Sequence, residues 1–330
     1  MLKSIKTICW CTFTAMNNSK GWCYWPHLVA FIVGVLSMSA NAGFVNDTIE
    51  KIANSEFIFD TADTNSPFLP IAFVDYTHYG ERELSSVCLQ GPTCDVDWQK
   101  LSQMAAVPIW INNRDILLVG EYLSVDWIEG EAVDDAIYSF GAILAWLRQV
   151  NDHWQVGTFV FPTFYSALSD TGRYAESIYL GSVGRHRHSA RFHSYWGLAA
   201  DINNIENIYY PYLAFDWFIN REWAIAFIMP WPAITYAPNP DYFWRVGLLP
   251  GATQLRFEEG GQLINAGLDQ WDLGLTVEHR IHNQVWAGLS LGVSGFGQIT
   301  LDESLASEFE HEIEATVFGR FSVNFRPDAP

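Results

Sequence analysis

The densest group of side chains that could do chemistry is GRHRHSARFH, residues 184–193. Alternate residues of a β-strand point to opposite faces, so these polar side chains fall into two sets. One set is Arg185, Arg187, Arg191 and His193, and the other is His186 and His188. Such a cluster could favour anions, hold a metal ion through imidazole nitrogens, or pair with acidic side chains on neighbouring strands. The pattern favours pairing and leaves the other two interpretations open.

Further charges recur at alternate positions of later segments that have the pattern of strands. If these strands enclose a lumen, their mixed signs predict ion pairs across it, and in a narrow barrel such pairs would close the pore. The candidate lumen cluster comprises Arg185, Arg187, Arg191, His193, Asp216, Glu278, Arg280, Glu314 and Arg320, with Arg245, Arg256 and Glu312 at similar positions.

No catalytic motif accompanies these charges. We identify no nucleophile elbow, which needs a serine on a strand-to-helix turn, and no P-loop, HExxH or EF-hand pattern. The sequence therefore predicts no catalytic residue, no metal site and no cofactor. An enzyme is the less favoured class.

The segment 209–231, YYPYLAFDWFINREWAIAFIMPW, shows the kind of element that must position the charges. Leu213 and Trp217 share one face of its first run, while Asp216 lies on the other. A polar turn at 220–222 leads to a second alternating run, which predicts an antiparallel hairpin. A face so dense in aromatic residues is typical of strands that contact lipid.

Alternating segments of this kind predict an all-β fold, a transmembrane antiparallel up-and-down barrel. Fourteen strands are expected, and twelve is the alternative because the first two segments are weak and 242–259 could be one bent strand. Short connections at 112–114, 151–152, 220–222, 250–251 and 282–283 alternate with longer ones, as in outer-membrane barrels. The longer connections are 80–104, 128–134, 167–173, 237–241, 260–267 and 298–310. The predicted strands lie near 68–79, 105–112, 115–127, 135–149, 153–166, 174–184, 189–201, 207–219, 222–236, 242–249, 252–259, 268–281, 284–297 and 311–325.

Composition agrees with a membrane barrel. Hydrophobic residues make up 49% of the 330 residues and charged residues only 17%, with 15 Trp, 14 Tyr and 22 Phe. Such high aromatic content with few charges is unusual for a soluble enzyme. The alternative is a secreted aromatic-rich β-sandwich.

The N-terminal segment predicts export. An apolar run at 28–38 follows Lys20 and precedes Ser39-Ala40-Asn41-Ala42, which has the small residues of a cleavage site. This is typical of a secretory signal peptide, cleaved here after Ala42. Met16 would start a signal of ordinary length, and an uncleaved anchor is the alternative. The expected domains are a signal peptide at 1–42, a periplasmic lead-in or plug at 43–67, the barrel at 68–325 and a tail at 326–330.

Cleavage would leave a strongly acidic chain with two cysteines. Removing three lysines from the 18 basic residues leaves 15 against 37 acidic ones, a net charge of −22. That balance argues against nucleic acid and an anionic membrane surface as partners. Cys88 and Cys94 remain, and an oxidising compartment predicts a disulfide between them.

The last predicted strand, EATVFGRFSVNF, ends on Phe325. Such aromatic-ended strands are typical of chains that the barrel assembly machinery recognises, although five residues follow Phe325 here. The expected partners are outer-membrane lipid and that machinery, in the bacterial outer membrane. The oligomeric state stays open.

The segments NIYYPYLAFDW and REWAIAFIMPWPAITYAPN resemble an uncharacterised family of bacterial outer-membrane β-barrels that carry a domain of unknown function. The shared features are a Tyr-Pro-Tyr-like strand, a Trp-bearing next strand and a loose Pro-x-x-x-x-Tyr-x-Pro exit between Pro230 and Pro238. The resemblance covers 68–325 and is clearest at 207–258. It implies the barrel fold and no activity.

Two classes of function follow. The first is a passive pore, or a transport or structural barrel of the outer membrane. The second is a membrane enzyme with a site at the barrel rim that acts on lipids. The secreted β-sandwich binding protein is a third, less favoured class.

Overall fold

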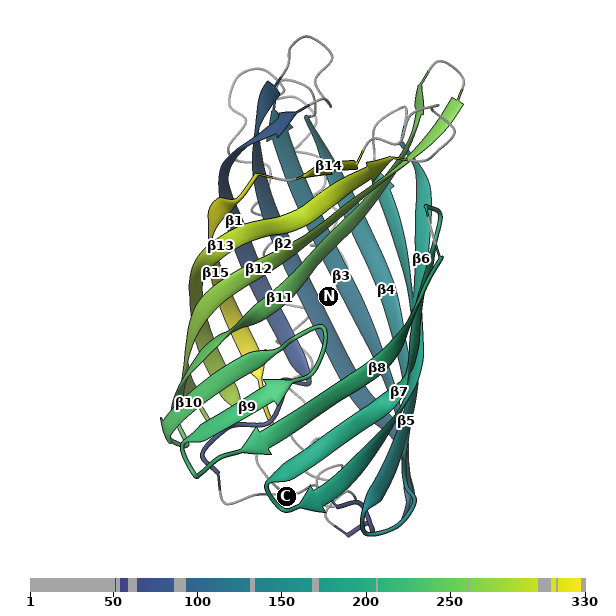
Figure 1. Ribbon diagram of the computed structural model, residues 1–330. Coiled ribbons are helices and arrows are strands. Elements are labelled where there is room, and N and C mark those ends of the chain that lie inside the picture. The colour runs from purple at the N-terminus through teal and green to yellow at the C-terminus, as the bar shows by residue number, and fades with distance from the viewer. Residues whose placement is uncertain are drawn as a thin grey trace, which may run out of the picture. The chain divides into compact units, whose positions relative to one another are not determined.

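The computed structural model describes residues 51, 54–58, 64–85, 93–130, 134–167, 172–205, 207–259, 262–301, 310–312 and 314–327. Its strands form one antiparallel sheet that closes on itself through the pairing of β1 with β15 (Figure 1). The first eight are β1 (Ala72–Ser85), β2 (Thr93–Ile111), β3 (Asp115–Gly130), β4 (Asp134–Gln149), β5 (Trp154–Ala167), β6 (Gly172–Ser189), β7 (Phe192–Asn203) and β8 (Asn207–Phe218). The others are β9 (Trp223–Phe227), β10 (Ala233–Asn239), β11 (Tyr242–Glu259), β12 (Gln262–His282), β13 (Val285–Leu301), β14 (Glu310–Glu312) and β15 (Thr316–Phe325).

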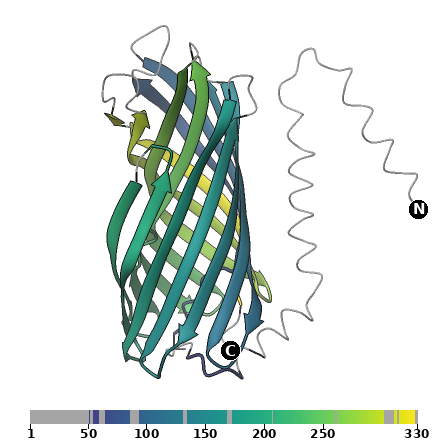
Figure 2. The ribbon, with the colours of Figure 1, turned by 90° about the vertical axis from the view of Figure 1, so that its right-hand side faces the viewer.

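The barrel has fourteen strand positions. The short strand β14 pairs only with β13 in the described residues, and β15 continues along the same neighbour. They therefore share one position, and the prediction of a closed antiparallel barrel of 12–14 strands is confirmed. The strands run obliquely to the barrel axis in two perpendicular views (Figures 1 and 2). No helix in the described part of the chain has the length and apolar character needed to cross a membrane.

The two ends of the barrel differ in their connections. Tight turns join β2 to β3, β4 to β5, β6 to β7, β8 to β9, β10 to β11 and β12 to β13, and we call this the turn end. Side-chain oxygens of Asn112, Asn151 and Asn220 each accept hydrogen bonds from backbone N–H groups within these turns. These bonds explain why asparagine occupies these positions. In outer-membrane barrels the short turns face the periplasm. We call the opposite end the loop end.

Two adjacent strand predictions were wrong. The predicted strand 222–236 is two strands, β9 and β10, joined by a turn at 228–232. The predicted turn at Pro250-Gly251 lies inside the single strand β11, so the alternative of one strand at 242–259 is the correct one. Consequently 237–241 belongs mostly to β10 and to a tight turn at the turn end, and is no long loop. Pro230 and Pro232 explain the first error, because two prolines so close together interrupt strand hydrogen bonding.

The first long loop was also predicted incorrectly. Most of 80–104 is strand, since β1 continues to Ser85 and β2 begins at Thr93. Cys88 lies outside the described residues, and only the backbone of Cys94 is described, so the disulfide stays a prediction. The predicted signal peptide at 1–42 also lies outside them.

Strand alternation separates an apolar outer face from a polar inner one. Leu213, Trp217 and Phe321 are 58%, 45% and 53% exposed on the outer face, as lipid contact requires. On the inner face lie buried polar residues such as Asp126 and Asp272. The predicted shared outer face of Leu213 and Trp217 agrees with these exposures.

Candidate functional site at the turn end of the lumen

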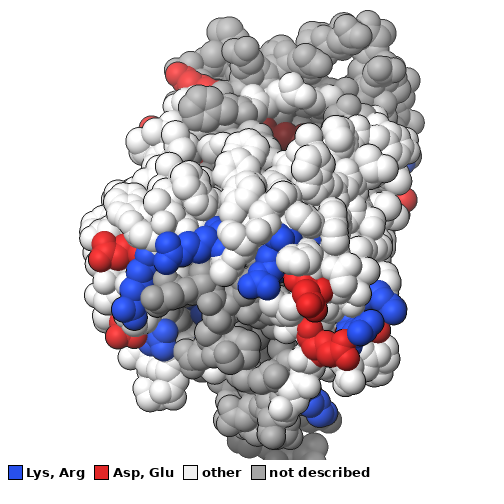
Figure 3. Space-filling model, turned by 60° about the horizontal axis from the view of Figure 1, so that its bottom comes forward, with Lys and Arg blue, Asp and Glu red and all other residues white. Residues whose placement is uncertain are grey.

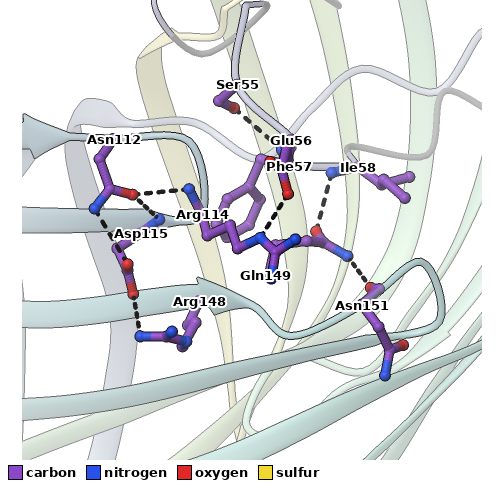
Figure 4. Close-up of polar contacts among 10 residues, drawn as sticks. All are labelled: Ser55, Glu56, Phe57, Ile58, Asn112, Arg114, Asp115, Arg148, Gln149 and Asn151. Carbon is purple, nitrogen blue, oxygen red and sulfur yellow. Dashed lines mark hydrogen bonds and ion pairs between the residues drawn. The ribbon is translucent and has the colours of Figure 1, made fainter.

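Residues 54–58 of the predicted lead-in are bonded to the turn end of the barrel (Figure 4). The backbone N–H of Glu56 donates to the carbonyl of Asn113 at 2.7 Å, and Arg114 donates from Nε to the Glu56 carboxylate at 2.5 Å. Ile58 N–H donates to Gln149 Oε1 at 3.0 Å. This segment therefore docks on the turns before β3 and after β4.

Residues 64–71 are bonded to a different part of the same rim. Asn65 N–H donates to the Arg221 carbonyl at 2.7 Å, and Asn65 Nδ2 donates to the Ala237 carbonyl at 3.0 Å. Ile71 N–H then donates to the Phe325 carbonyl at 3.0 Å, where the chain enters β1. We call residues 54–58 and 64–71 together the strap.

The two docking points of the strap lie at different turns of the rim. Ile58 lies by the β4–β5 turn and Thr64 by the β8–β9 turn. The described parts of the strap therefore contact two turns that are separated along the rim by β5, β6, β7 and β8.

A small polar pocket lies where the strap meets β4–β6. Gln155 Nε2 donates to the Ile58 carbonyl at 2.9 Å and to Gln149 Oε1 at 2.7 Å. Arg185 Nη1 donates to Gln155 Oε1 at 2.8 Å, so a guanidinium is held by a neutral amide. The pocket is lined by Ile58, Gln149, Asp152, His153, Gln155, Arg185 and Arg187. Figure 3 views this end and shows Lys and Arg side chains in a row across it, with acidic side chains mainly at its two sides.

The structure places the other residues of the predicted 184–193 cluster elsewhere. His193 is fully buried and forms a hydrogen bond with Asp216, its register partner on β8. Tyr195 Oη also donates to Asp216, at 2.6 Å. Arg191 lies exposed in the β6–β7 turn. The register of β7 and β8 thus brings together His193 and Asp216, two predicted site residues whose contact was not predicted.

His186 and His188 lie near the outer aromatic side chains of the turn end. The His186 ring lies 4.5 Å from that of Trp154 between centroids, and the His188 Nε2 atom lies 2.8 Å from Ser194 Oγ. Among the described residues, no group of three or more His, Cys, Asp and Glu side chains is arranged to hold a metal ion. The histidine metal site therefore has no support in this part of the chain.

Three of the remaining predicted lumen charges form ion pairs with residues that the sequence analysis did not identify. Arg320 donates to Asp272 at 2.9 Å, and Glu278 accepts from Arg326 at 2.8 Å, a residue predicted to lie in a tail. Arg280 lies 3.1 Å from Asp241 in the β10–β11 turn. Asp272 has the same strand parity as Glu278 and Arg280, so parity could have identified it. Glu314 is exposed and precedes β15.

A second buried pair joins β2 and β3. Lys100 Nζ lies 3.3 Å from Asp126 Oδ1, and Trp98 Nε1 donates to the same carboxylate at 3.0 Å. The Trp98 ring packs on that of Tyr79, 4.8 Å away between centroids. Charged inner-face residues with resolved pairs thus concentrate on β12, β15 and β1–β3.

The inner face of β3–β8 also carries a run of aromatic rings. Tyr122 meets Phe161 edge to face at 5.9 Å between centroids, and Phe159 lies 5.2 Å from Tyr179. Tyr179 stacks on Tyr210 of β8 at 6.3 Å. We call this run of rings the aromatic wall. The same strands also carry the buried pair of His193 and Asp216 near the turn end.

The segment 288–292, GLSLG, has the residue pattern of a nucleophile elbow. Ser290, however, lies in the middle of β13 and not on a strand-to-helix turn. It is buried and shares a 2.8 Å hydrogen bond with Thr276 on the neighbouring strand. Ser290 is therefore a cross-strand structural residue.

Comparisons with known proteins assign no function to the chain. No protein-family model and no curated protein matches the chain, which agrees with an uncharacterised family. The structure is similar to the COG4313 outer membrane channel from Pseudomonas putida F1, with 12% identity and a TM-score of 0.39 over 78% of this chain and 97% of that one.

Two further solved structures are similar at the same level. The KdgM porin in complex with disordered oligogalacturonate shares 8% identity, with a TM-score of 0.35 over 77% of this chain and 98% of that one. The TodX monoaromatic hydrocarbon channel deltaS2 mutant shares 7%, with a TM-score of 0.35 over 78% and 90%. At such values the likeness carries no argument about function. The chain has the fold of an outer-membrane β-barrel.

Proposed function

We propose that this protein is a passive channel of the bacterial outer membrane that favours small anions and whose periplasmic mouth is narrowed by the strap. The observation that carries the proposal is the presence of both Arg185 and Arg187 in the mouth pocket, where Asp152 is the one acid among the described lining residues. A mouth lined by one sign of charge raises the local concentration of the opposite ion.

The position of Arg185 supports the proposal. One of its hydrogen bonds goes to the neutral amide of Gln155, which orients the guanidinium in the mouth pocket. The strap is held by hydrogen bonds that each contribute about 1 kcal/mol, so it can be displaced.

Planar-bilayer recording tests the proposal. The reversal potential under a KCl gradient should show anion preference, and Arg185→Gln combined with Arg187→Gln should reduce it. Arg148→Gln is the matched control, since Arg148 already lies 3.2 Å from Asp115 and should leave selectivity unchanged. Cation preference in the unmodified protein, or unchanged preference in the double variant, would refute the anion assignment.

The alternative of a rim-site enzyme that acts on lipids has no observation in its favour within the described residues. Hydrolysis of labelled phospholipid by the reconstituted protein would revive it.

A further inference from the structure

The sheet is interrupted between β8 and β11. The register pairs β9 with only the last part of β8, Phe215–Phe218, and β10 with only the first part of β11, up to Gly247. Within the described residues, Asn207–Ala214 therefore pair on one side only, with β7. Leu249–Leu255 likewise pair only with β12. We call the region between these two edges the sheet break.

The sheet break tapers from the turn end toward the loop end. At the level of the β9–β10 turn, β8 and β11 stand three strand spacings apart, about 14 Å. Further along, β11 approaches β6 and pairs with it at Arg256 and Phe257. The unpaired stretch of β11 is about 20 Å long at about 3.4 Å per residue. Figure 1 shows this triangular gap between the ribbons of β8, β9, β10 and β11.

The edges of the sheet break lie in the lipid-facing belt. On its margins Tyr209, Leu213, Trp231 and Val246 are 72%, 58%, 50% and 50% exposed on the outer face. Unpaired backbone groups are costly in hydrocarbon and are tolerated where they line a cavity or are otherwise satisfied. A break at this height therefore needs a structural explanation.

Proline chemistry at the edges supplies part of that explanation. Pro211 lies on the β8 edge, Pro250 lies on the β11 edge, and Pro230 and Pro232 lie in the turn between β9 and β10. Proline has no N–H, so each removes a donor that would otherwise lack a partner strand. Prolines also prevent another strand from adding to these edges. The break is thus built into the sequence.

Side chains hold the turn at the wide end of the break. Tyr212 Oη on β8 donates to the Met229 carbonyl at 2.8 Å, and Arg245 Nη2 on β11 donates to the Trp231 carbonyl at 3.1 Å. These bonds satisfy carbonyls that face no strand. They also hold the turn in place between the two edges.

The aromatic wall of the lumen extends to the sheet break. Its rings pass from β5 and β6 to β8 through Phe159, Tyr179 and Tyr210, and Tyr210 lies on the unpaired edge. On the other edge, Leu249 faces inward beside Asp272, its register partner on β12. An aromatic surface that runs from the lumen to an interruption of the sheet in the apolar belt suits an uncharged apolar molecule.

We propose that the sheet break is a lateral portal through which small uncharged apolar molecules pass between the lumen and the bilayer. The portal goes beyond the proposed ion path and does not depend on it, because ions use the two mouths. The source of the molecule is the bilayer interior or the lumen, and no protein partner is involved.

Photolabelling of the full-length protein in phosphatidylethanolamine–phosphatidylglycerol vesicles tests the portal. The probe is a free aryl diazirine dissolved in the bilayer, and labelled residues are mapped by mass spectrometry. Outer-face Leu213 should be labelled in any case. Inner-face Tyr210 and Leu249 should be labelled as well if the probe enters through the break.

Variants separate the portal from entry through a mouth. Leu249→Trp should fill the inner side of the break and lower the labelling of Tyr210 several-fold, while Leu213 labelling stays constant. Leu248→Trp, one residue away on the outer face, is the matched control and should leave Tyr210 labelling unchanged. A heat-modifiable gel shift in each variant verifies that the barrel is folded.

Two results would overturn the proposal. One is the absence of label on Tyr210 and Leu249 in unmodified protein whose Leu213 is labelled. The other is equal Tyr210 labelling in folded Leu249→Trp protein, which would mean entry through a mouth. The reversal potential of Leu249→Trp channels should be unchanged, so failure of the portal and failure of the ion channel are distinguishable.

Discussion

The buried pair of Lys100 and Asp126 gives the sharpest test of the charged lumen wall. Asp126 is fully buried and accepts hydrogen bonds from Trp98 at 3.0 Å and from Ser124 at 3.5 Å, beside the Lys100 ammonium at 3.3 Å. Asp126→Leu would leave the ammonium buried without its counter-charge. We expect a loss of about 3–5 kcal/mol in the free energy of unfolding, as for other buried pairs that lose one partner.

The double variant should recover most of that loss. Lys100→Met combined with Asp126→Leu removes both charges and replaces them with apolar groups, a change that is often nearly neutral for buried pairs. The indole N–H of Trp98 would still lose its acceptor, which costs about 1–3 kcal/mol. The two single variants together would lose about 6–10 kcal/mol, so the coupling energy should exceed about 3 kcal/mol.

Urea unfolding in lipid vesicles, followed by tryptophan fluorescence and the heat-modifiable gel shift, measures these differences. Glu56→Gln is the control, because the Glu56–Arg114 pair is about half exposed and should contribute about 1 kcal/mol or less. A double variant that is as unstable as the sum of the single variants would contradict the reasoning. It would mean that the two side chains do not interact across the strands.

Three further predictions concern the lipid face, the strap and the first long loop. Leu213→Arg should lower stability by about 2–4 kcal/mol in vesicle unfolding experiments, whereas Leu69→Arg in the exposed strap should change it by about 0.5 kcal/mol or less; equal costs would place Leu213 outside the membrane. Asn65→Ala removes side-chain contacts with Ala237 and Arg221 and should raise single-channel conductance or opening frequency in planar bilayers, and unchanged traces would show that the strap does not restrict the mouth. Thiol counting by mass spectrometry should find Cys88 and Cys94 joined in protein from intact cells, while reduction should leave the gel shift intact; two free thiols before reduction would contradict the bond.

The sequence by itself determined the strand pattern and the two faces. Alternation is a local property of the strand backbone, so Leu213, Trp217 and Phe321 could be assigned to lipid before any pairing was known. The same parity identified Asp216, Glu278 and Arg320 as inner-face candidates. Their partners could not be named, because a partner depends on register, which the turns and the whole closed sheet set together. His193 meets Asp216 only because β7 and β8 pair in one particular register.

Only the tertiary structure decided what the prolines do. Pro230 and Pro232 end a strand, whereas Pro250 lies within an unbroken one. Proline is compatible with a strand when its nitrogen, which carries no hydrogen, faces no neighbouring strand. The pairing of β10 with β11 does not extend as far as Pro250. Whether a neighbour is present depends on the lengths of other strands, which a local pattern does not contain. The docking of the strap could not be predicted for the same reason. The turns that it contacts are far apart in the sequence and come to lie on one rim only when the barrel closes.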